Sequence, residues 1–290
     1  MATVVQKTLL LEEANIKQYC SADGLSLSAG GYAIRKWLNG STSGYATLNS
    51  AAKEVLYPST TAHPFKADSE IRGSRSAGSM TVNLEFAGTV VDSESFTSTS
   101  LKTVTKTDIS DAAVMGSTRD TEIRWNVKGK NGDAQRIAHV KITLYFNQYN
   151  AQAFIGNGAN GVQSVSVSNT TPCYGDTITF GVKLVQGATF NGWYSDSACT
   201  QLVSTDTTYS IAPTADVTLY AKATTDATLY NVSAIAGSEI TGVNVSDSIV
   251  PEGGTATFTA QVNTGCSFEA WYSDDTYTTV VSTENPYTAT

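Results

Sequence analysis

The sequence predicts a mainly β protein, in which an N-terminal β-rich domain, a sandwich or barrel with one or two short helices, precedes small β modules repeated in tandem. Three observations predict this class. Short runs of alternating apolar and polar residues recur along the chain, whereas long apolar runs with a helical period are scarce. Only 15% of the residues are charged, and Gly, Ser and Thr are plentiful. Finally, residues 162–212 align without a gap on residues 240–290.

Residues 1–150 form the first predicted domain. The segment SMTVNLEFAGTVV (79–91) alternates as a half-buried strand does. The segment TEIRWNVKGKNGDAQRIAHVKITLYFNQY predicts a long hairpin with its turn at GKNG, residues 129–132, which accept positive φ. The residues expected on the apolar faces of its two strands are Ile123, Trp125 and Val127, then Ala138, Val140, Ile142, Leu144 and Phe146.

Less regular segments complete this domain. Two short helices are predicted near 11–19 and near 48–56. Residues 92–118 are rich in Ser and Thr and weakly patterned, which favours an extended arm or loop. By analogy with other proteins, we expect such an arm to become ordered against a neighbouring subunit.

Charge divides the chain into unlike halves. Residues 1–150 hold 16 of the 18 Lys and Arg against 14 Asp and Glu, whereas residues 151–290 hold only Lys183 and Lys222 against 12 acids. The halves therefore carry about +2 and −10, which suggests different roles. An acidic segment almost without basic residues cannot replace the counterions of a phosphate backbone. Nucleic-acid binding is excluded for the second half and disfavoured for the first.

The repeated segment predicts two copies of one small β module. Matched positions alternate along short runs, and the glycines fall between the runs, where turns belong. The motif WYSD at Trp193–Asp196 recurs at Trp271–Asp274. We expect the first module at 151–225 and the second at 226–290.

The first copy carries a family resemblance. Its pattern GDTITF, GATFNGWYSD, VST, a tyrosine and then DVTLYAKA resembles the divergent internalin-type B repeat, also called the Listeria–Bacteroides repeat. The resemblance covers about 162–223 fully and 240–290 partly, with Ala270 in place of Gly192. It implies small extracellular β modules of bacterial surface proteins, also found in phage proteins, and no catalytic residues.

The two copies place their aromatic residues at the same spacing, and this shared spacing predicts a structural core in each. Aromatic side chains bury large areas, which a small module needs. The alternative for Trp193 and Trp271 is an exposed platform for sugar. Acidic turns at Asp196 and Asp274-Asp275 lack the dense ligand spacing of a calcium loop and are interpreted as solvated. The predicted core residues are Phe180, Phe190, Trp193, Tyr209, Phe258, Phe268, Trp271 and Tyr287.

No motif for catalysis, a cofactor or a metal emerges. There is no GxSxG, HExxH or P-loop pattern, and the only histidines, His63 and His139, lack a neighbouring nucleophile in the sequence. We therefore expect no enzyme and no cofactor. The cysteines show no CxxC spacing. A disulfide between Cys173 and Cys199 is one interpretation, because both fall in one repeat, and small buried thiols are the other. The remaining cysteines are Cys20 and Cys266.

The two ends of the chain raise separate expectations. The segment MATVVQKTLLLEEANIKQYC has a short apolar part followed directly by acids, which is not a secretory signal, so synthesis in a cytoplasm is expected. No stretch approaches the length needed to span a bilayer. The closing strand DVTLYAKA of the first copy would fall beyond Thr290 in the second. The second module therefore lacks this strand, and we expect the natural polypeptide to continue.

These features favour a non-enzymatic structural protein of a phage virion, in the tail or as a capsid-decoration or head-fibre component. Residues 1–150 would form a homo-oligomer and contact other virion proteins. The acidic repeats would face outward as spacers or as weak adhesion modules for host-surface glycans or proteins, without nucleic acid or membrane insertion. The alternatives are a bacterial cell-surface adhesin, with Met1 introduced by cloning, and a carbohydrate-binding module.

Overall fold

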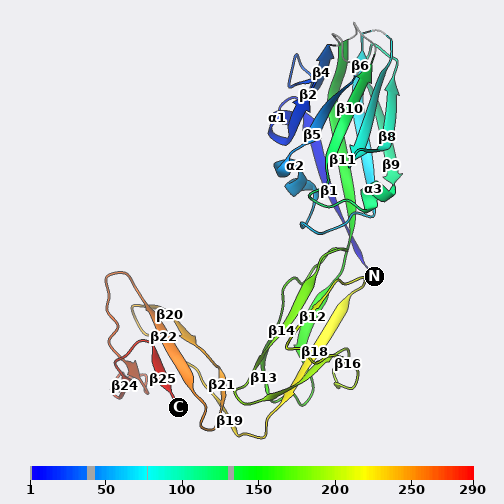
Figure 1. The fold of residues 1–290 in the computed structure, drawn as a ribbon. Coiled ribbons are helices and arrows are strands. Elements are labelled where there is room, and N and C mark those ends of the chain that lie inside the picture. Colours follow the sequence, from blue (N-terminus) through cyan, green and yellow to red (C-terminus); the bar gives the residue numbers. More distant parts are fainter. Residues whose placement is uncertain (1, 38–42, 77, 130–133) are drawn as a thin grey trace. The chain divides into compact units, whose positions relative to one another are not determined.

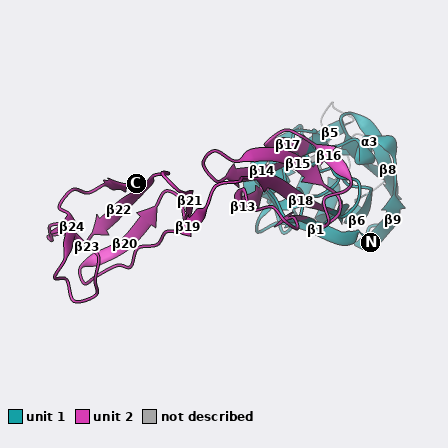
Figure 2. Ribbon diagram, turned by 90° about the horizontal axis from the view of Figure 1, so that it is seen from below, with its two compact units in different colours: residues 1–151, 169–178, 211–217 teal, residues 152–168, 179–210, 218–290 magenta. Residues whose placement is uncertain are grey.

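The computed structural model describes residues 2–37, 43–76, 78–129 and 134–290, and its chain divides into two compact units (Figure 2). Unit 1 comprises Met1–Ala151, Asn169–Ile178 and Ile211–Val217, and unit 2 comprises Gln152–Ser168, Thr179–Ser210 and Thr218–Thr290. Strands dominate both units (Figure 1), which confirms the predicted mainly β class. Among the described residues, no helix is long and apolar enough to cross a membrane.

Unit 1 is built around two antiparallel sheets rather than a barrel. The six-stranded sheet has the order β3-β4-β11-β6-β9, with β1 also paired to β11. Its strands are β1 (Thr3–Glu12), β3 (Ser26–Leu27), β4 (Ile34–Trp37), β6 (Lys66–Arg75), β9 (Lys102–Ile109) and β11 (Ala134–Gln148). The five-stranded sheet, β2-β5-β10-β7-β8, contains β2 (Cys20–Asp23), β5 (Ser43–Leu48), β10 (Ile123–Gly129), β7 (Met80–Phe86) and β8 (Thr89–Phe96).

One apolar core holds these sheets together. Alternate residues of facing strands are fully buried, including Trp125 and Val127 of β10 and Val140 and Phe146 of β11. This is the arrangement that the alternating sequence pattern produces when two sheets pack face to face. Burying a large apolar side chain stabilises the fold by about 1.5–3 kcal/mol, so these alternate positions determine the sandwich.

The predicted hairpin of residues 121–149 is wrong. Strand β10 pairs with β5 and β7, whereas β11 pairs with β1, β4 and β6, so the two strands belong to different sheets. Their apolar sides lie in the common core instead of side by side in one sheet. The turn expected at 129–132 falls mostly on residues 130–132, outside the described part. A register shift between Ile137 and His139 also buries Ile137 fully, and not Ala138.

Two other local predictions need correction. The segment 79–91 contains a tight turn at Ala87 and Gly88, with φ of 47° and 80°, between β7 and the start of β8. Residues 92–118 are not an arm: they contain the rest of β8, all of β9, and the short helix α3 (Ala112–Met115). Both strands pair along most of their length. Each lies at the edge of its sheet, where a polar sequence is tolerated, and this polar sequence is what favoured a loop.

The two predicted helices are present but short. Helix α1 spans Ile16–Tyr19, after the strand β1 has taken up residues through Glu12. Helix α2 spans Ser50–Leu56, and the side chain of its N-cap residue, Asn49, accepts a hydrogen bond from the Ala52 N–H at 3.1 Å. The helices pack through Ile16, Ala52 and Leu56 on the core of the sandwich.

The repeats contain two sets of small sheets. In the first copy, β12-β18-β15-β16 and β13-β14-β17 are formed by β12 (Ala151–Ile155), β13 (Val162–Val167), β14 (Ile178–Leu184), β15 (Thr189–Tyr194), β16 (Leu202–Ser204), β17 (Thr208–Ile211) and β18 (Val217–Thr224). In the second, β19-β21, β20-β22-β25 and β23-β24 are formed by β19 (Leu229–Asn231), β20 (Ile240–Val245), β21 (Ile249–Pro251), β22 (Ala256–Val262), β23 (Trp271–Tyr272), β24 (Val280–Ser282) and β25 (Tyr287–Ala289).

Candidate binding surfaces

The aromatic cluster of the first repeat is an interior feature. Trp193 is 0% exposed, and its ring centroid lies 5.8 Å from Phe180 and 6.0 Å from Phe190. The closely spaced, tilted rings are a favourable arrangement for aromatic packing. Because Trp193 is fully enclosed, it cannot present a platform to a sugar. Tyr209, the other predicted core residue of this copy, is half-buried on β17.

The aromatic cluster of the second repeat has the same contacts but is more open. The Trp271 ring lies 5.8 Å from Phe258 and 5.4 Å from Phe268, and Phe258 stacks on Tyr287 at 6.2 Å. All four side chains are half-buried. The Trp271 indole N–H donates to the Glu284 carbonyl oxygen at 3.1 Å. The second copy therefore exposes part of what the first copy encloses.

The acidic turns hold their carboxylates with hydrogen bonds from their own loops. Asp196 accepts from the Gln201 N–H at 2.6 Å, and Asp274 accepts from the Thr279 N–H at 2.7 Å and the Thr276 hydroxyl at 2.6 Å. The Thr276 hydroxyl and the backbone N–H groups keep the pKa of Asp274 below its ordinary value. No group of three His, Cys, Asp or Glu residues within the described ranges has a metal-binding arrangement.

The cysteines and histidines are dispersed. All four thiols are free in the structure: Cys20, Cys173 and Cys199 are buried and Cys266 is exposed, so the suggested Cys173–Cys199 disulfide is not formed here. Burial raises the pKa of Cys20 to about 12 and that of Cys173 to about 11, which makes these thiols poor nucleophiles at neutral pH. The His139 Nε2 atom lies 2.9 Å from a carboxylate oxygen of Glu70, and both residues belong to the six-stranded sheet.

A polar hollow lies on the outer side of the six-stranded sheet, a surface that the sequence did not single out. Its volume is about 220 Å³. Tyr145 donates to Asp68 at 2.6 Å, an interaction that raises the pKa of this tyrosine to about 12. Lys141 lies 3.8 Å from Glu70. The lining residues are Gln6, Thr8, Asp68, Ser69, Glu70, Thr105, Lys141, Thr143 and Tyr145. The sequence pattern places Lys141 and Tyr145 off the apolar face of β11, and this was the one sign in the sequence of a polar surface here.

The outer side of the five-stranded sheet carries a second polar cluster. The Arg124 Nε donates to Glu85 at 2.7 Å, and its guanidinium lies 4.3 Å from the centre of the Tyr45 ring. Asn126 donates to the same carboxylate at 2.8 Å. Sequence reasoning missed this cluster because its members come from three separate strands. Glu85 and Asn126 are nevertheless only 4% and 3% exposed, so this cluster is largely buried and Arg124 is its more accessible member.

Comparisons with known proteins identify the repeats. Residues 153–222 match the family model described as the Listeria-Bacteroides repeat domain, and residues 228–290 match that of the divergent InlB B-repeat domain. The resemblance predicted from the sequence is confirmed for the C-terminal half, and these domains indicate a surface- or adhesion-type β protein. Repeats of this kind are generally non-catalytic. No curated protein matches the chain.

Several solved carbohydrate-binding modules show a distant likeness. One is the CBM36-1 domain of a xylanase from the hindgut metagenome of Trinervitermes trinervoides, with 12% identity, 47% of this chain and 95% of that chain covered, and a TM-score of 0.31. A CBM36 in complex with calcium and xylotriose has 18% identity, coverage of 48% and 98%, and a TM-score of 0.31. The CBM6 of a laminarinase from Zobellia galactanivorans has 17% identity, coverage of 47% and 98%, and a TM-score of 0.30. Likeness at this level says nothing about the function of this chain.

Proposed function

We propose that this protein is a non-enzymatic structural component of a phage particle, in the tail or as a capsid-decoration or head-fibre protein. In this proposal residues 1–150 assemble with copies of themselves and with other virion proteins, and the two repeats face outward. The observation that carries the proposal is the division of charge, about +2 in residues 1–150 and −10 in residues 151–290. A near-neutral domain suits close subunit packing, whereas an acidic one stays soluble and resists non-specific association.

The sandwich supports an assembly role. Its outer sides carry ion pairs such as Arg124 with Glu85 and Lys66 with Asp108, the latter at 2.5 Å. Polar, mixed-charge surfaces favour specific contacts and suppress wrong ones. Strand β1 pairs with β11 over ten residues, from Thr3 to Glu12, so this N-terminal segment is an integral strand of the six-stranded sheet. The expected oligomer would form through these surfaces.

Electron microscopy with an antibody against residues 153–290 tests the proposal. Material released by lysis of the natural host would be labelled and compared with intact cells. Regular labelling of symmetric particles, with the antibody sites on the outside, is the expected result. Labelling confined to the cell envelope would overturn the virion role and leave the adhesin.

The second candidate is a bacterial cell-surface adhesin. The repeat domains favour it directly, because they indicate a surface- or adhesion-type protein. It predicts labelling of the envelope, and weak binding of the repeats to surface glycans or proteins. A carbohydrate-binding module that uses the repeat tryptophans is less well supported, because Trp193 is buried.

A further inference from the structure

Large apolar side chains form a row across the four-stranded sheet of the first repeat. In the strand register, Tyr194 of β15 lies opposite Tyr220 of β18 on one side and Leu202 of β16 on the other. On β12, the Phe154 ring lies 5.8 Å from the Tyr220 ring, with 29° between their planes. Each of the four strands therefore contributes one residue to this row, which we call the outer strip.

The outer strip lies on the solvent side of the sheet. Trp193 and Ala221, the chain neighbours of the two strip tyrosines, are 0% exposed. Successive residues of a strand point to opposite sides, so the strip faces away from this interior. Phe154 is 46% exposed and Leu202 is 56% exposed, whereas the two tyrosines are half-buried. Exposed apolar residues that gather in one patch, unlike scattered ones, indicate an interaction surface.

The second repeat keeps the central pair of this strip. Tyr272 corresponds to Tyr194 and lies opposite Val280 of β24, the counterpart of Leu202. Val280 is 54% exposed, close to the value for Leu202 in the first repeat. Tyr277 adds a ring 5.4 Å from that of Tyr272 and is itself 58% exposed. An apolar pair thus recurs at positions where burial in the core does not require one.

The surface of this pair is also shaped by the residue beside it. Gly192 lies in a bulge of β15, and a Cβ at this position would collide with the Leu202 Cδ1 atom. The Leu202 side chain therefore reaches over the glycine. In the second repeat Ala270 replaces the glycine and Val280 replaces the leucine, so one carbon is gained where one is lost. The exposed surface is packed as a core would be, which favours a function for it.

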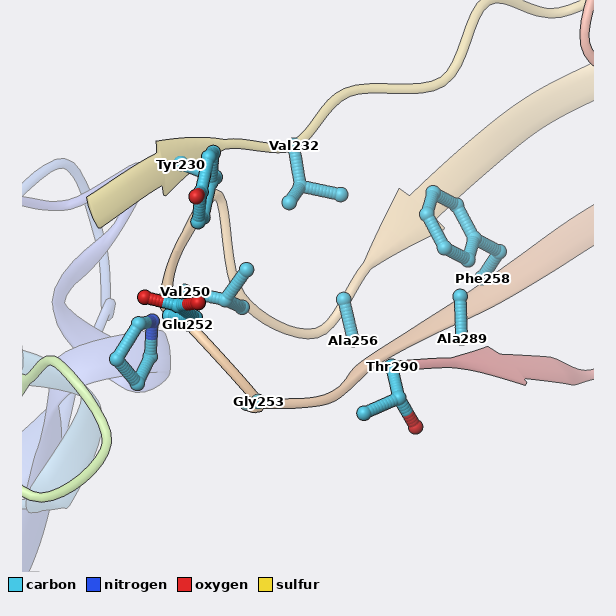
Figure 3. A pocket seen from close by; sticks show the side chains of 11 residues that line it. Tyr230, Val232, Val250, Glu252, Gly253, Ala256, Phe258, Ala289 and Thr290 are labelled. Atoms are coloured by element: carbon cyan, nitrogen blue, oxygen red, sulfur yellow. The ribbon is translucent and has the colours of Figure 1, made fainter. Parts of the chain in front are cut away.

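An apolar hollow in the second repeat is a separate feature. Its volume is about 290 Å³, and Figure 3 shows Tyr230, Val232, Phe258 and Ala289 among its lining side chains. The Phe258 ring lies 5.8 Å from that of Trp271, in the aromatic cluster of this copy. The exposed tyrosine and valine pair is not part of the lining. The hollow therefore belongs to the inner side of the second repeat and not to the surface of the strip.

Charge indicates what the strip would bind. Residues 151–290 hold 12 acids and only two basic residues. At the strip tyrosine of the second repeat, partial burial raises the pKa of Tyr272, and the carboxylates of Glu269 and Asp274 raise it further. The tyrosine therefore lies in a negative field. Such a field attracts cationic partners and repels a second acidic repeat.

We propose that the outer strip and its counterpart in the second repeat are docking surfaces for a basic polypeptide, whose apolar side chains contact the strip while its Lys and Arg residues face the acids of the repeat. Arginine side chains also stack favourably on tyrosine rings. A neutral glycan is disfavoured, because Phe154 and Leu202 offer its hydroxyls no hydrogen-bonding side chain. This inference goes beyond the proposed function, since it applies equally to repeats displayed on a particle or on a cell.

Synthetic peptides test the surface on the full-length chain. The probe RLRLRLR combines arginine with leucine. The peptide RSRSRSR keeps its charge without the apolar groups, and ELELELE keeps the leucines with the opposite charge. We expect RLRLRLR to bind saturably and at least about tenfold more tightly than either control. Equal binding of RSRSRSR would reduce the effect to general charge attraction and overturn the proposal, and equal binding of ELELELE would overturn the basic partner.

Matched variants locate the site. Phe154→Ser and Ile155→Ser remove side chains of equal exposure, 46% and 47%, that point to opposite sides of β12. Leu202→Ser and Val203→Ser form a second such pair on β16. Only Phe154→Ser and Leu202→Ser should weaken binding of RLRLRLR, by about fivefold or more, with the Tm of each variant recorded as the check on folding. Equal weakening within either pair would overturn the strip as the site.

Other occupants give different results in the same experiment. Binding of the neutral oligosaccharides xylotriose or cellotriose that is lost in Phe154→Ser, without binding of RLRLRLR, would overturn the polypeptide in favour of a glycan. A stable dimer of the unmodified chain that Leu202→Ser dissociates would assign the strip to a second copy. Raising the salt concentration should weaken binding of RLRLRLR, because salt screens exposed charges. Failure of every probe to bind would overturn the surface itself.

Discussion

At the scale of single residues, the two copies of the repeat place the same side chain in different surroundings. Trp193 is completely enclosed, whereas Trp271 contacts the equivalent aromatic rings but stays half-buried. The free energy that a side chain contributes follows the area it removes from water and the quality of its packing. Identical sequence motifs should therefore contribute unequally to stability.

Replacing these tryptophans measures the difference. Trp193→Ala should destabilise the first module by about 3–5 kcal/mol, in the range of fully buried aromatic residues. Trp271→Ala should cost less, under about 3 kcal/mol, because part of its surface is already in water. Chemical unfolding followed separately for each module by hydrogen exchange would give both values. Trp193→Phe, which keeps a ring in the core, is the control. Equal losses in the two modules would contradict this account.

The Asp274 turn gives a pH-dependent prediction. Hydrogen bonds from the Thr276 hydroxyl and the Thr278 and Thr279 N–H groups lower the pKa of this carboxyl from 3.8. A lowered pKa in the folded state stabilises the fold above pH 3.8, and this contribution is lost as the pH falls through the folded value. Asp274→Asn should therefore lower the Tm of the second module at pH 7.

The pH series provides the check on that variant. The Tm difference between the wild type and Asp274→Asn should stay constant from pH 7 to about pH 5 and shrink as the pH falls below 3.8. Comparing the two proteins at each pH cancels the effect of neutralising the other acidic residues. A difference that is unchanged at low pH would show that the carboxylate charge is not responsible.

At the scale of elements, Gly192 and Ala270 show how one position shapes a strand. A Cβ on Gly192 would lie 2.4 Å from the Leu202 Cδ1 and 2.7 Å from the Ser204 carbonyl oxygen, and the φ of +139° disfavours any side chain. Gly192→Ala should destabilise the first module by about 1–3 kcal/mol. Ala270→Gly, the reverse change, should cost about 0.5–1 kcal/mol through backbone entropy alone.

Thermal unfolding of both variants tests the bulge. The first should lower the Tm of its module clearly, and the second only slightly. If Gly192→Ala leaves the Tm unchanged, β15 and β16 can separate without cost and the bulge is not needed for pairing.

The same scale shows what the sequence could predict. Alternation in β10 and β11 correctly identified the buried residues except at Ala138, where the register shift buries Ile137 instead, since alternation depends only on which side of a strand faces the core. Alternation carries no information about which strands pair, so adjacent strands were joined into a hairpin although they lie in different sheets. The polar edge strand β9 gave no apolar pattern and was expected to be a loop. The polar clusters around Glu85 and Asp68 depend on long-range pairing, which the sequence alone did not reveal.

At the scale of the whole molecule, one loop of each copy contacts residues outside that copy. The 169–178 segment of the first copy belongs to unit 1, where Asp176 accepts a hydrogen bond from the Thr61 hydroxyl at 2.9 Å. The corresponding segment of the second copy, 247–256, contacts Lys183 and Gln186 of the first copy. Each copy thus uses the same loop to contact residues that precede it in the chain.

The contacts of the 247–256 loop predict how far the stability of the second copy depends on residues of the first. Gln186 donates to the Thr255 carbonyl oxygen at 2.6 Å and accepts from the Thr255 N–H at 3.1 Å, and Lys183 lies 3.1 Å from Asp247. Gln186→Ala should destabilise the second module by about 0.5–1.5 kcal/mol, the net worth of a typical hydrogen bond, with little effect on the first. Lys183→Ala should cost no more than about 1 kcal/mol, because the ion pair is exposed.

Lys222→Ala provides the matched control, since Lys183 and Lys222 are the only basic residues in 151–290 and each change removes one positive charge from the acidic half. Hydrogen exchange resolved by module would separate a local contact from a general charge effect. If Lys183→Ala and Lys222→Ala lower the stability of the second module equally, net charge and not the junction is responsible. If Gln186→Ala destabilises the first module as much as the second, the two copies unfold as one cooperative unit, and the loop is part of a shared structure rather than a contact between separate modules.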